Sequence, residues 1–308
     1  MNVRPTIAPL QPYTSSEELH ERCPGDGAIF ACDFYVTGAE HGTVEPGGLR
    51  LGRILNVDHH APVARMEQEI TSTMLAAQYL EAGGEVDPAA HVVIHHTDCD
   101  SVLSSAMMLG LLPSDPDLVR ASVCADHTGA AHPVADLLQA LDDGRGGTRT
   151  LEQYETSLRN LRALLKGQPI EDEAIEALKR REQRRAAAMA LVDAGDFEID
   201  SQGLVAFAES DGSIDSAFFP AQLLPAALIM VAHRRDDAHW TVKLRLGGRR
   251  VPGLTLHTLG VAGWDPAFGG RWNAGSNGRG GGTSLPPREY AARLRQRVLE
   301  VVEKSTTT

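Results

Sequence analysis

Residues 91–100 read HVVIHHTDCD, a short apolar run that passes directly into two histidines and two aspartates. β-Branched runs of this length are typical of buried parallel strands. The same junction occurs at three other places, where the runs 28–32, 53–57 and 119–125 lead into Asp33, Asp58 and Asp126. The sequence therefore predicts four buried strands, each of which ends in a polar cluster.

Helical patterns separate these runs. One covers residues 66–82 and ends at Gly83-Gly84, and another covers residues 101–112 and ends at Pro113. Strands that alternate with helices indicate an α/β fold with a doubly wound, mostly parallel sheet. Ligands bind at the carboxyl ends of the strands in such sheets, so we expect the polar clusters to share one site.

The rest of the chain has a different pattern. Residues 151–194 are helical and charged with a break at 167–169, and residues 144–147 are expected to form a flexible loop. Strands are expected at 203–209, 226–233 and 239–246, then a Gly-dense loop at 268–282 and a helix at 286–302. We predict a larger domain over 1–150, a helical connector over 151–195 and a second, smaller α/β domain over 196–308.

The composition suits a cytoplasmic protein. The N-terminus lacks the pattern of a secretory signal, and the four cysteines form no C-x-x-C pair, so they are expected to be reduced thiols. The most apolar run, 218–232, is too short to span a bilayer and contains Pro220 and Pro225. We therefore expect no membrane association.

Charge is distributed unevenly along the chain, whose net charge is −12. Residues 1–202 carry 16 basic and 32 acidic side chains, whereas residues 203–308 carry 13 basic and 9 acidic ones. The acidic balance argues against a protein that coats long nucleic acid. A small phosphorylated substrate or a short oligonucleotide fits better, and the sequence is compatible with a homodimer.

The histidines and aspartates indicate a metal site. Seven of the twelve histidines fall between residues 59 and 132. Carboxylate and imidazole without a thiolate pair suit Mn, Mg, Fe or Zn in a hydrolytic site. The alternative is that these side chains cap helices and bind loop backbone. His91 and His132 fit that structural role better, whereas His95 and His127 fit either.

Several motifs resemble those of the DHH phosphoesterase superfamily, although their order differs. The tripeptide Asp58-His59-His60, followed by Thr71-Ser72-Thr73 at a helix start, is similar to the family's signature. The segment 96–100 is similar to its H-x-D-x-D motif, Asp33 to its lone strand-end aspartate, and 126–129 to its Asp-Thr motif. The family's H-x-D-x-D motif normally precedes DHH, whereas here it follows, as in a permuted chain.

The resemblance implies two divalent cations. Mn²⁺ is the preferred ion, and Mg²⁺ is the alternative. Asp33 would bridge them, His96 and Asp98 would complete one site, and His59, Asp100 and Asp126 would complete the other. Whether His95 or His96 is the ligand stays open. Asp58 would orient His59, and His60 would face the substrate as a phosphate ligand or general acid.

The C-terminal part resembles the DHH-associated domain, whose glycine-rich motif is similar to residues 268–275. The implied substrate-binding residues are Arg245, Gly269, Gly270, Arg271 and Trp272. Trp272 stands about where the family places a substrate-contacting histidine. It could stack on a nucleobase or lie in the core, and the Gly-rich loop could bind an anion or be a mobile surface loop.

These observations lead to one functional hypothesis and two alternatives. The first is a divalent-metal-dependent phosphoesterase (phosphodiesterase or phosphomonoesterase) that hydrolyses a small nucleotide or short oligonucleotide. The second is a pyrophosphatase or polyphosphatase, against which the tryptophan counts because a diphosphate offers nothing to stack. The third is a non-catalytic regulator that binds metal and nucleotide without hydrolysis.

Overall fold

A computed structural model describes residues 6–7, 14–60, 70–86, 89–143 and 150–306. The expected loop at 144–147 and the first residues of the expected helix at 66–82 lie outside these ranges. The chain forms two compact units. The first consists of Met1–Asp126 with Ala131–Arg181, and the second of His127–Ala130 with Glu182–Thr308. The domain boundaries inferred from the sequence stay predictions.

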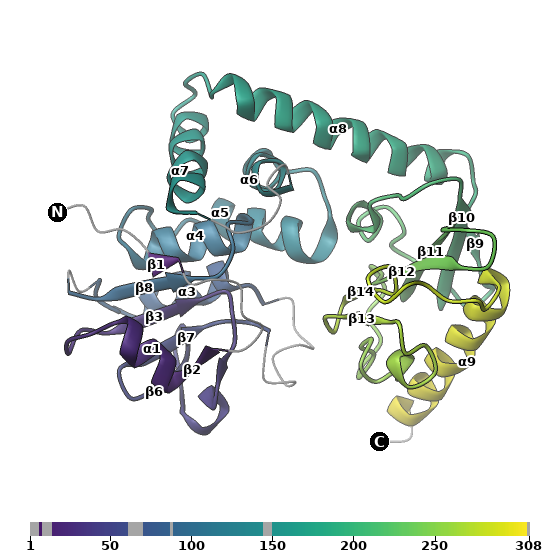
Figure 1. The fold of residues 1–308 in the computed structure, drawn as a ribbon, viewed down its shortest axis with the longest axis horizontal. Helices are drawn as coiled ribbons and strands as arrows, with labels where there is room; N and C mark the ends of the chain where they lie inside the picture. Colours follow the sequence, from purple (N-terminus) through teal and green to yellow (C-terminus); the bar gives the residue numbers. More distant parts are fainter. Residues whose placement is uncertain (1–5, 8–13, 61–69, 87–88, 144–149, 307–308) are drawn as a thin grey trace. The chain divides into compact units, whose positions relative to one another are not determined.

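The first unit is built on a mostly parallel sheet (Figure 1). Its strands lie in the order β1 (Thr6–Ile7), β8 (His91–Ile94), β3 (Ile29–Cys32), β7 (Ile54–Val57), β6 (Gly48–Leu51) and β5 (Thr43–Glu45). The first four are parallel, and β6 and β5 add an antiparallel edge. A separate parallel pair joins β2 (Thr14–Ser15) to β4 (Val36–Thr37). The predicted α/β class is confirmed.

Strand order in space differs from strand order in the chain. β3 lies between β8 and β7, although in the chain β3 comes first of the three, β7 second and β8 last. Because the three strands are parallel, their carboxyl ends reach the same edge of the sheet. Asp33, Asp58 and His95 are the first residues after these ends. The motif order along the chain therefore does not prevent the three clusters from meeting.

Helices cover both faces of this sheet, as the doubly wound prediction requires. Ile29 and Ala31 of β3 pack in a core cluster with Leu19 of α1 (Ser16–Arg22). On the opposite face, the ring of Phe30 lies 5.5 Å from that of Tyr79 in α3 (Ser72–Glu81). This alternation is the period-two geometry of a strand. The described part of the unit also contains α4 (Cys99–Met108), α5 (Pro116–Val123), α6 (Pro133–Asp143), α7 (Leu151–Leu165) and the beginning of α8 (Asp172–Asp193).

One predicted strand is wrong. Residues 119–125 belong to α5 and to the π-helical turn Cys124–Thr128 that follows it, not to the sheet. The local signals for a helix start explain the error: Asp115 caps the helix by accepting a hydrogen bond from the Asp117 N–H, and Pro116 occupies the first turn. These signals outweigh the β-branched run. Asp126 therefore lies in a π turn rather than at the end of a strand.

The second unit contains a mixed sheet in the order β13 (Gly269–Gly270), β14 (Ala274–Ser276), β12 (Trp240–Leu246), β11 (Leu228–Arg234), β10 (Val205–Ser210) and β9 (Glu198–Ile199). Only β10 and β11 pair in parallel. Val242 and Leu244 of β12 pack with Tyr290 and Leu294 of α9 (Pro287–Thr306). The three predicted strands and the final helix are confirmed. The Gly-dense segment is not a plain loop, because it contains β13 and β14.

The charged helical region is also confirmed. It forms α7 and α8 (Asp172–Asp193), separated at the expected break, where the Gly167 N–H closes the last turn of α7 on Leu164 O. α8 contributes to both units, since the division falls after Arg181. Short 3₁₀ turns occupy Ala39–His41, Ser216–Phe218 and Val261–Gly263.

Two further expectations concern the environment of the chain. All four cysteines lie in the described ranges, where they are buried and form no disulfide. Among the helices that the structure describes, none combines the length and the apolar character needed to cross a bilayer.

Candidate metal centre

Asp33 is the centre of the site. It follows β3 directly, is 1% exposed and has a φ of 61°, the left-handed region that a residue other than glycine rarely adopts. Its N–H donates to Val57 O of the next strand over 3.0 Å, which fixes this conformation. Strained backbone of this kind concentrates at functional sites. The turn aims the carboxylate across the ends of the parallel strands.

Three groups of potential ligands meet at Asp33. Within each group, one nitrogen or carboxylate oxygen of every residue lies within 4.8 Å of those of the others. The groups are Asp33 with His59 and His60, Asp33 with His59, Asp100 and Asp126, and Asp33 with His96 and Asp98. All six residues that the resemblance marks as ligands are therefore brought together, although their ligation of a metal stays a prediction.

One carboxylate oxygen of Asp33, Oδ1, faces His59. The His59 Nε2 lies 3.2 Å from Asp126 Oδ2, 3.5 Å from Asp100 Oδ2 and 3.6 Å from Asp33 Oδ1. Burial opposes protonation of this imidazole, but Asp126 and Asp33 outweigh burial and raise the pKa of His59 well above its usual value. One imidazole is thus surrounded by three carboxylates.

The other side of Asp33 faces His96. The His96 Nε2 lies 3.3 Å from Asp33 Oδ2 and 3.6 Å from Asp98 Oδ2. Asp98 is the N-cap of α4, where its Oδ1 accepts a hydrogen bond from the Ser101 N–H over 3.0 Å. Capping with one oxygen leaves the second directed at His96.

His95 and His96 lie in different surroundings. His95 is buried, its Nε2 is 3.0 Å from Thr14 Oγ1, and its ring stacks on Phe34 at 3.8 Å between centroids. Burial lowers its pKa to about 4, so it is a neutral packing residue at neutral pH. His96 is the member of the pair that contacts Asp33.

His60 is held by its own motif. Its ring Nδ1 donates to Asp58 Oδ1 over 2.6 Å, and its backbone N–H donates to Asp58 Oδ2 over 3.1 Å. The resemblance implied that Asp58 orients His59, whereas this bond shows Asp58 orienting His60. The His60 side chain is 22% exposed, so it can be reached from solvent. Catalysis by His60 and Asp58 stays a prediction.

The other three histidines between residues 59 and 132 have neighbours outside the cluster. His91 Nε2 pairs with Pro24 O over 3.0 Å, and His132 Nε2 lies 3.4 Å from Asp117 Oδ1, as suits the structural role expected for both. His127 follows the ligand candidate Asp126 but belongs to the second unit. There its ring lies 5.8 Å from that of Trp272.

The donor set fits divalent cations. Asp33, Asp100 and Asp126 are each at most 3% exposed, so their charges repel one another away from solvent. Burial raises the pKa of Asp100 well above its usual range, and the charge of Asp33 adds to the effect. Burial also raises the pKa of Asp98 to about 7. Oxygen and imidazole donors on both sides of one carboxylate suit a pair of hard or borderline cations.

Serine and threonine hydroxyls support the carboxylates, and the sequence reasoning gave them no role. Ser72 Oγ donates to Asp33 Oδ1 over 3.1 Å, and Ser101 Oγ donates to Asp33 Oδ2 over 2.7 Å. The available signal was their position, because Ser72 opens α3 and Ser101 lies in the first turn of α4. Hydroxyls at helix starts beside strand-end aspartates are well placed to bind them.

The expected substrate residues gather at one hairpin of the second unit. Arg245 in β12 pairs in register with Ala274 of β14. Gly269 and Gly270 form β13, and a Cβ on Gly270 would lie 2.3 Å from Gly275 Cα, so close strand packing requires the glycine there. The need for glycine is therefore explained without an anion.

The tip of this hairpin carries Arg271 and Trp272. The Arg271 N–H donates to Ala274 O over 2.7 Å, so it closes the hairpin. Trp272 is 3% exposed and its carbonyl accepts a hydrogen bond from the Leu256 N–H over 2.7 Å. Burial favours the core alternative for Trp272. Contact of either side chain with substrate stays a prediction.

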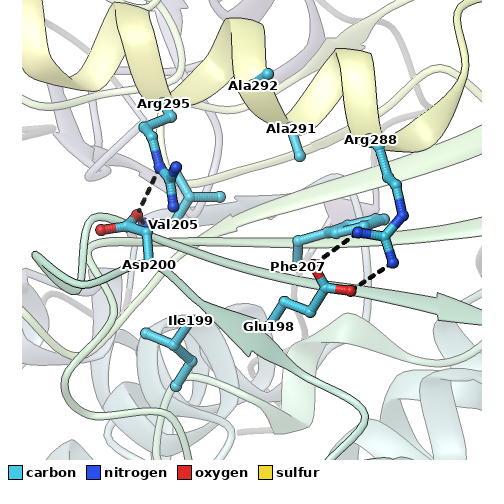
Figure 2. Close-up of a pocket in the computed structure, with 9 residues that line it drawn as sticks. All are labelled: Glu198, Ile199, Asp200, Val205, Phe207, Arg288, Ala291, Ala292 and Arg295. Atoms are coloured by element: carbon cyan, nitrogen blue, oxygen red, sulfur yellow. Dashed lines mark hydrogen bonds and ion pairs between the residues drawn. The ribbon is translucent and has the colours of Figure 1, made fainter.

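A solvent-open cavity of about 230 Å³ lies elsewhere in the second unit, between α9 and the strands β9 and β10 (Figure 2). Two ion pairs cross it, Glu198 with Arg288 at 2.6 Å and Asp200 with Arg295 at 3.4 Å. Its lining contains none of the expected site residues.

Comparison with known proteins adds distant structural similarities. No family model and no curated protein sequence matches the chain. A pGpG-specific phosphodiesterase, PggH from Vibrio cholerae, is 10% identical with a TM-score of 0.44 over 73% of this chain and 88% of that one. An exopolyphosphatase-related protein from Bacteroides fragilis is 13% identical with a TM-score of 0.35 over 72% and 62%. An uncharacterised protein from Helicobacter pylori is 11% identical with a TM-score of 0.20 over 74% and 79%. These values are too low to transfer an activity.

Proposed function

We propose that this chain is a divalent-metal-dependent phosphoesterase of the DHH type, acting on a small nucleotide or a short oligonucleotide. The observation that supports this most is the meeting of three ligand groups at Asp33, at the ends of adjacent parallel strands. A buried cluster of carboxylates and imidazoles costs stability unless a cation compensates it. The DHH-like motif supplies two members of that cluster, His59 and His60.

The chemistry expected of the cations is specific. When bound, two divalent cations lower the pKa of a water molecule and offset the charge of the phosphoryl oxygens. The chain's own residues divide the binding between them. Asp33 presents Oδ1 toward His59 and Oδ2 toward His96, which is the arrangement required of a carboxylate shared by two sites.

His60 is the proposed proton donor to the leaving oxygen. It is oriented by Asp58 over 2.6 Å and is partly open to solvent, whereas His59 is buried among carboxylates. A general acid needs both a fixed ring and access to substrate. His60 meets both requirements.

The second unit is proposed to bind the part of the substrate that does not react. Arg245 has the guanidinium that suits a phosphate or a carboxylate. Residues 203–308 carry four more basic than acidic side chains, in keeping with an anionic ligand. Trp272 is 3% exposed, so stacking on its ring does not support the choice of a nucleotide over a diphosphate, and this choice rests on the sequence resemblance.

The proposal is tested by hydrolysis assays on the full chain. The protein is stripped with EDTA, supplied with Mn²⁺ or Mg²⁺, and assayed on bis-p-nitrophenyl phosphate, di- and trinucleotides, phosphoadenosine phosphate, cyclic dinucleotides and pyrophosphate. Metal-dependent cleavage of a nucleotide substrate is expected. Cleavage of pyrophosphate alone would favour a pyrophosphatase. Mn²⁺ binding without turnover of any substrate would favour a regulator.

A further inference from the structure

The start of α3 surrounds the Asp100 carboxylate with hydrogen-bond donors. The Ser72 N–H donates to Asp100 Oδ2 over 2.7 Å, and the Thr73 N–H donates to Oδ1 over 2.8 Å. The Thr73 hydroxyl donates to the same Oδ1 over 2.6 Å. All three residues are fully buried. Two consecutive backbone N–H groups and one side chain of a single helix start thus bind one aspartate.

The donors are divided unequally between the two oxygens of Asp100. Oδ1 accepts both bonds from Thr73, so its lone pairs are occupied. Oδ2 accepts one bond from Ser72 and lies 3.5 Å from His59 Nε2. Oδ2 is therefore the oxygen that lies against His59.

Asp33 shows the opposite distribution. Each of its oxygens accepts one hydroxyl donor, Oδ1 from Ser72 and Oδ2 from Ser101. Each oxygen also faces a histidine nitrogen, at 3.6 Å for His59 and 3.3 Å for His96. Asp33 can therefore offer both of its oxygens, whereas Asp100 can offer one.

We propose that Thr73 is a positioning residue that makes Asp100 a ligand through Oδ2 alone, in the cation site shared with His59 and Asp126. This inference rests on the proposed metal-dependent function. Two donors on Oδ1 fix the rotation of the carboxylate and keep it from binding through both oxygens. Supporting hydrogen bonds of this kind orient metal ligands and raise the affinity of the site.

The Thr73 hydroxyl is distinct from the cap of the helix. Thr71 is the N-cap of α3, its Oγ1 accepts a hydrogen bond from the Met74 N–H over 3.1 Å, and it pairs with Ser122 Oγ over 2.7 Å. Thr71 is as fully buried as Thr73. Its hydroxyl is therefore a matched control, because it is equally buried but bonds the Met74 N–H and Ser122 in place of a carboxylate of the cluster.

The test is calorimetric titration of Mn²⁺ into the EDTA-stripped full chain. In Thr73→Val we expect one of two binding events to weaken by roughly 10–100-fold, the range typical for lost support of a ligand. Thr73→Ser keeps the hydroxyl and should restore the affinity to within a few-fold. Thr71→Val should lower the melting temperature and leave both affinities unchanged. Thr73→Ala removes the same hydroxyl and serves if the valine variant does not fold.

The outcomes separate this inference from the function on which it rests. If the wild-type chain binds no Mn²⁺, both fail. If it binds two ions and Thr73→Val and Thr73→Ala bind them equally well, only the positioning role fails. An equal loss of affinity in Thr71→Val would show that helix stability matters rather than the bond to Asp100, and would overturn the role as well.

Discussion

Each unit contains a buried carboxylate site, and the two are built differently. In the second unit, Asp265 is 3% exposed and accepts hydrogen bonds from Asn277 Nδ2 over 3.0 Å and from the Tyr290 hydroxyl over 2.8 Å. In the first unit, Asp100 and Asp126 are similarly buried, yet both lie against His59 together with Asp33. One carboxylate is surrounded by neutral donors, and the others share their space with further carboxylates.

The two environments suggest two roles for a buried carboxylate, which either stabilises the fold or binds a ligand. A carboxylate whose neighbours are neutral donors alone joins neighbouring elements and needs no ligand. Asp100 has three such donors, but its Oδ2 also lies 3.5 Å from His59, which Asp33 and Asp126 approach as well. Several carboxylates around one imidazole repel each other, so the fold bears a cost that a bound cation would remove. The comparison predicts that mutation in the first site removes activity and mutation at Asp265 removes stability.

The largest effect is expected from Asp33→Asn. Asparagine tolerates the left-handed backbone at this position, so the fold should be kept. The amide cannot supply two anionic oxygens, and kcat/KM should fall by at least about 10³-fold, or roughly 4 kcal/mol. Mn²⁺-dependent hydrolysis of bis-p-nitrophenyl phosphate measures the loss, and thermal unfolding in EDTA checks the fold. Activity near the wild-type level would rule out Asp33 as a shared ligand.

The sequence predicts the polar clusters of this site better than it predicts their connection to the fold. Strand ends at Asp33 and Asp58 could be recognised because hydrophobic burial fixes where a parallel strand lies. The strand predicted before Asp126 was wrong, because Asp115 and Pro116 start a helix there through local interactions. The left-handed φ of Asp33 arises from tertiary contacts, which no pattern of residue types encodes.

The second unit shows the same limit more clearly. Its long strands were found from alternating apolar residues, such as Val242 and Leu244. The segment containing Gly269–Gly270 was expected to be a loop. Glycine occurs both in turns and where two backbones approach closely, so the residue type alone does not distinguish the two cases. Only the position of Gly275 against Gly270 distinguishes them.

The next largest effect concerns Arg245. If it binds the remote end of the substrate, Arg245→Ala should cut kcat/KM for a nucleotide by roughly 2–4 kcal/mol, since a charged contact is lost. A minimal aryl phosphodiester lacks that end and should be far less affected. Arg234→Ala is the control, because this arginine of β11 donates to Asp237 O on an exposed turn. Equal losses on both substrates would mean that Arg245 is structural.

Asp265→Ala should act on stability instead. Loss of the carboxylate leaves the buried Asn277 amide and the Tyr290 hydroxyl without this acceptor, at a cost of about 2 kcal/mol in the free energy of unfolding. Urea denaturation measures this cost. Tyr290→Phe removes a single donor and should cost about half as much. A loss of Mn²⁺ affinity with unchanged stability would contradict the division between the two kinds of burial.

The smallest effect is a pH dependence at Asp200, a carboxylate that is held by backbone donors and that also pairs with Arg295, as Figure 2 shows. Burial opposes its ionisation, but the N–H groups of Val205, Leu204 and Gln202 outweigh burial and lower its pKa. Its stabilisation is therefore complete above the unfolded pKa of about 3.9 and is lost as the pH falls through the lower folded value.

Asp200→Asn should accordingly lower the free energy of unfolding by about 1 kcal/mol near pH 6, because the amide accepts fewer of these bonds. The difference from the wild type should shrink as the pH falls below about 3.9 and through the lower folded pKa of Asp200, because the wild-type side chain then also becomes uncharged. Urea denaturation at a series of pH values measures it. Burial instead raises the pKa of Asp100, and the charges of Asp33 and Asp126 add to this rise. The opposite outcome would be a difference in the free energy of unfolding between the wild type and Asp200→Asn that grows as the pH falls. It would contradict the conclusion that hydrogen-bond donors stabilise the charged form of Asp200.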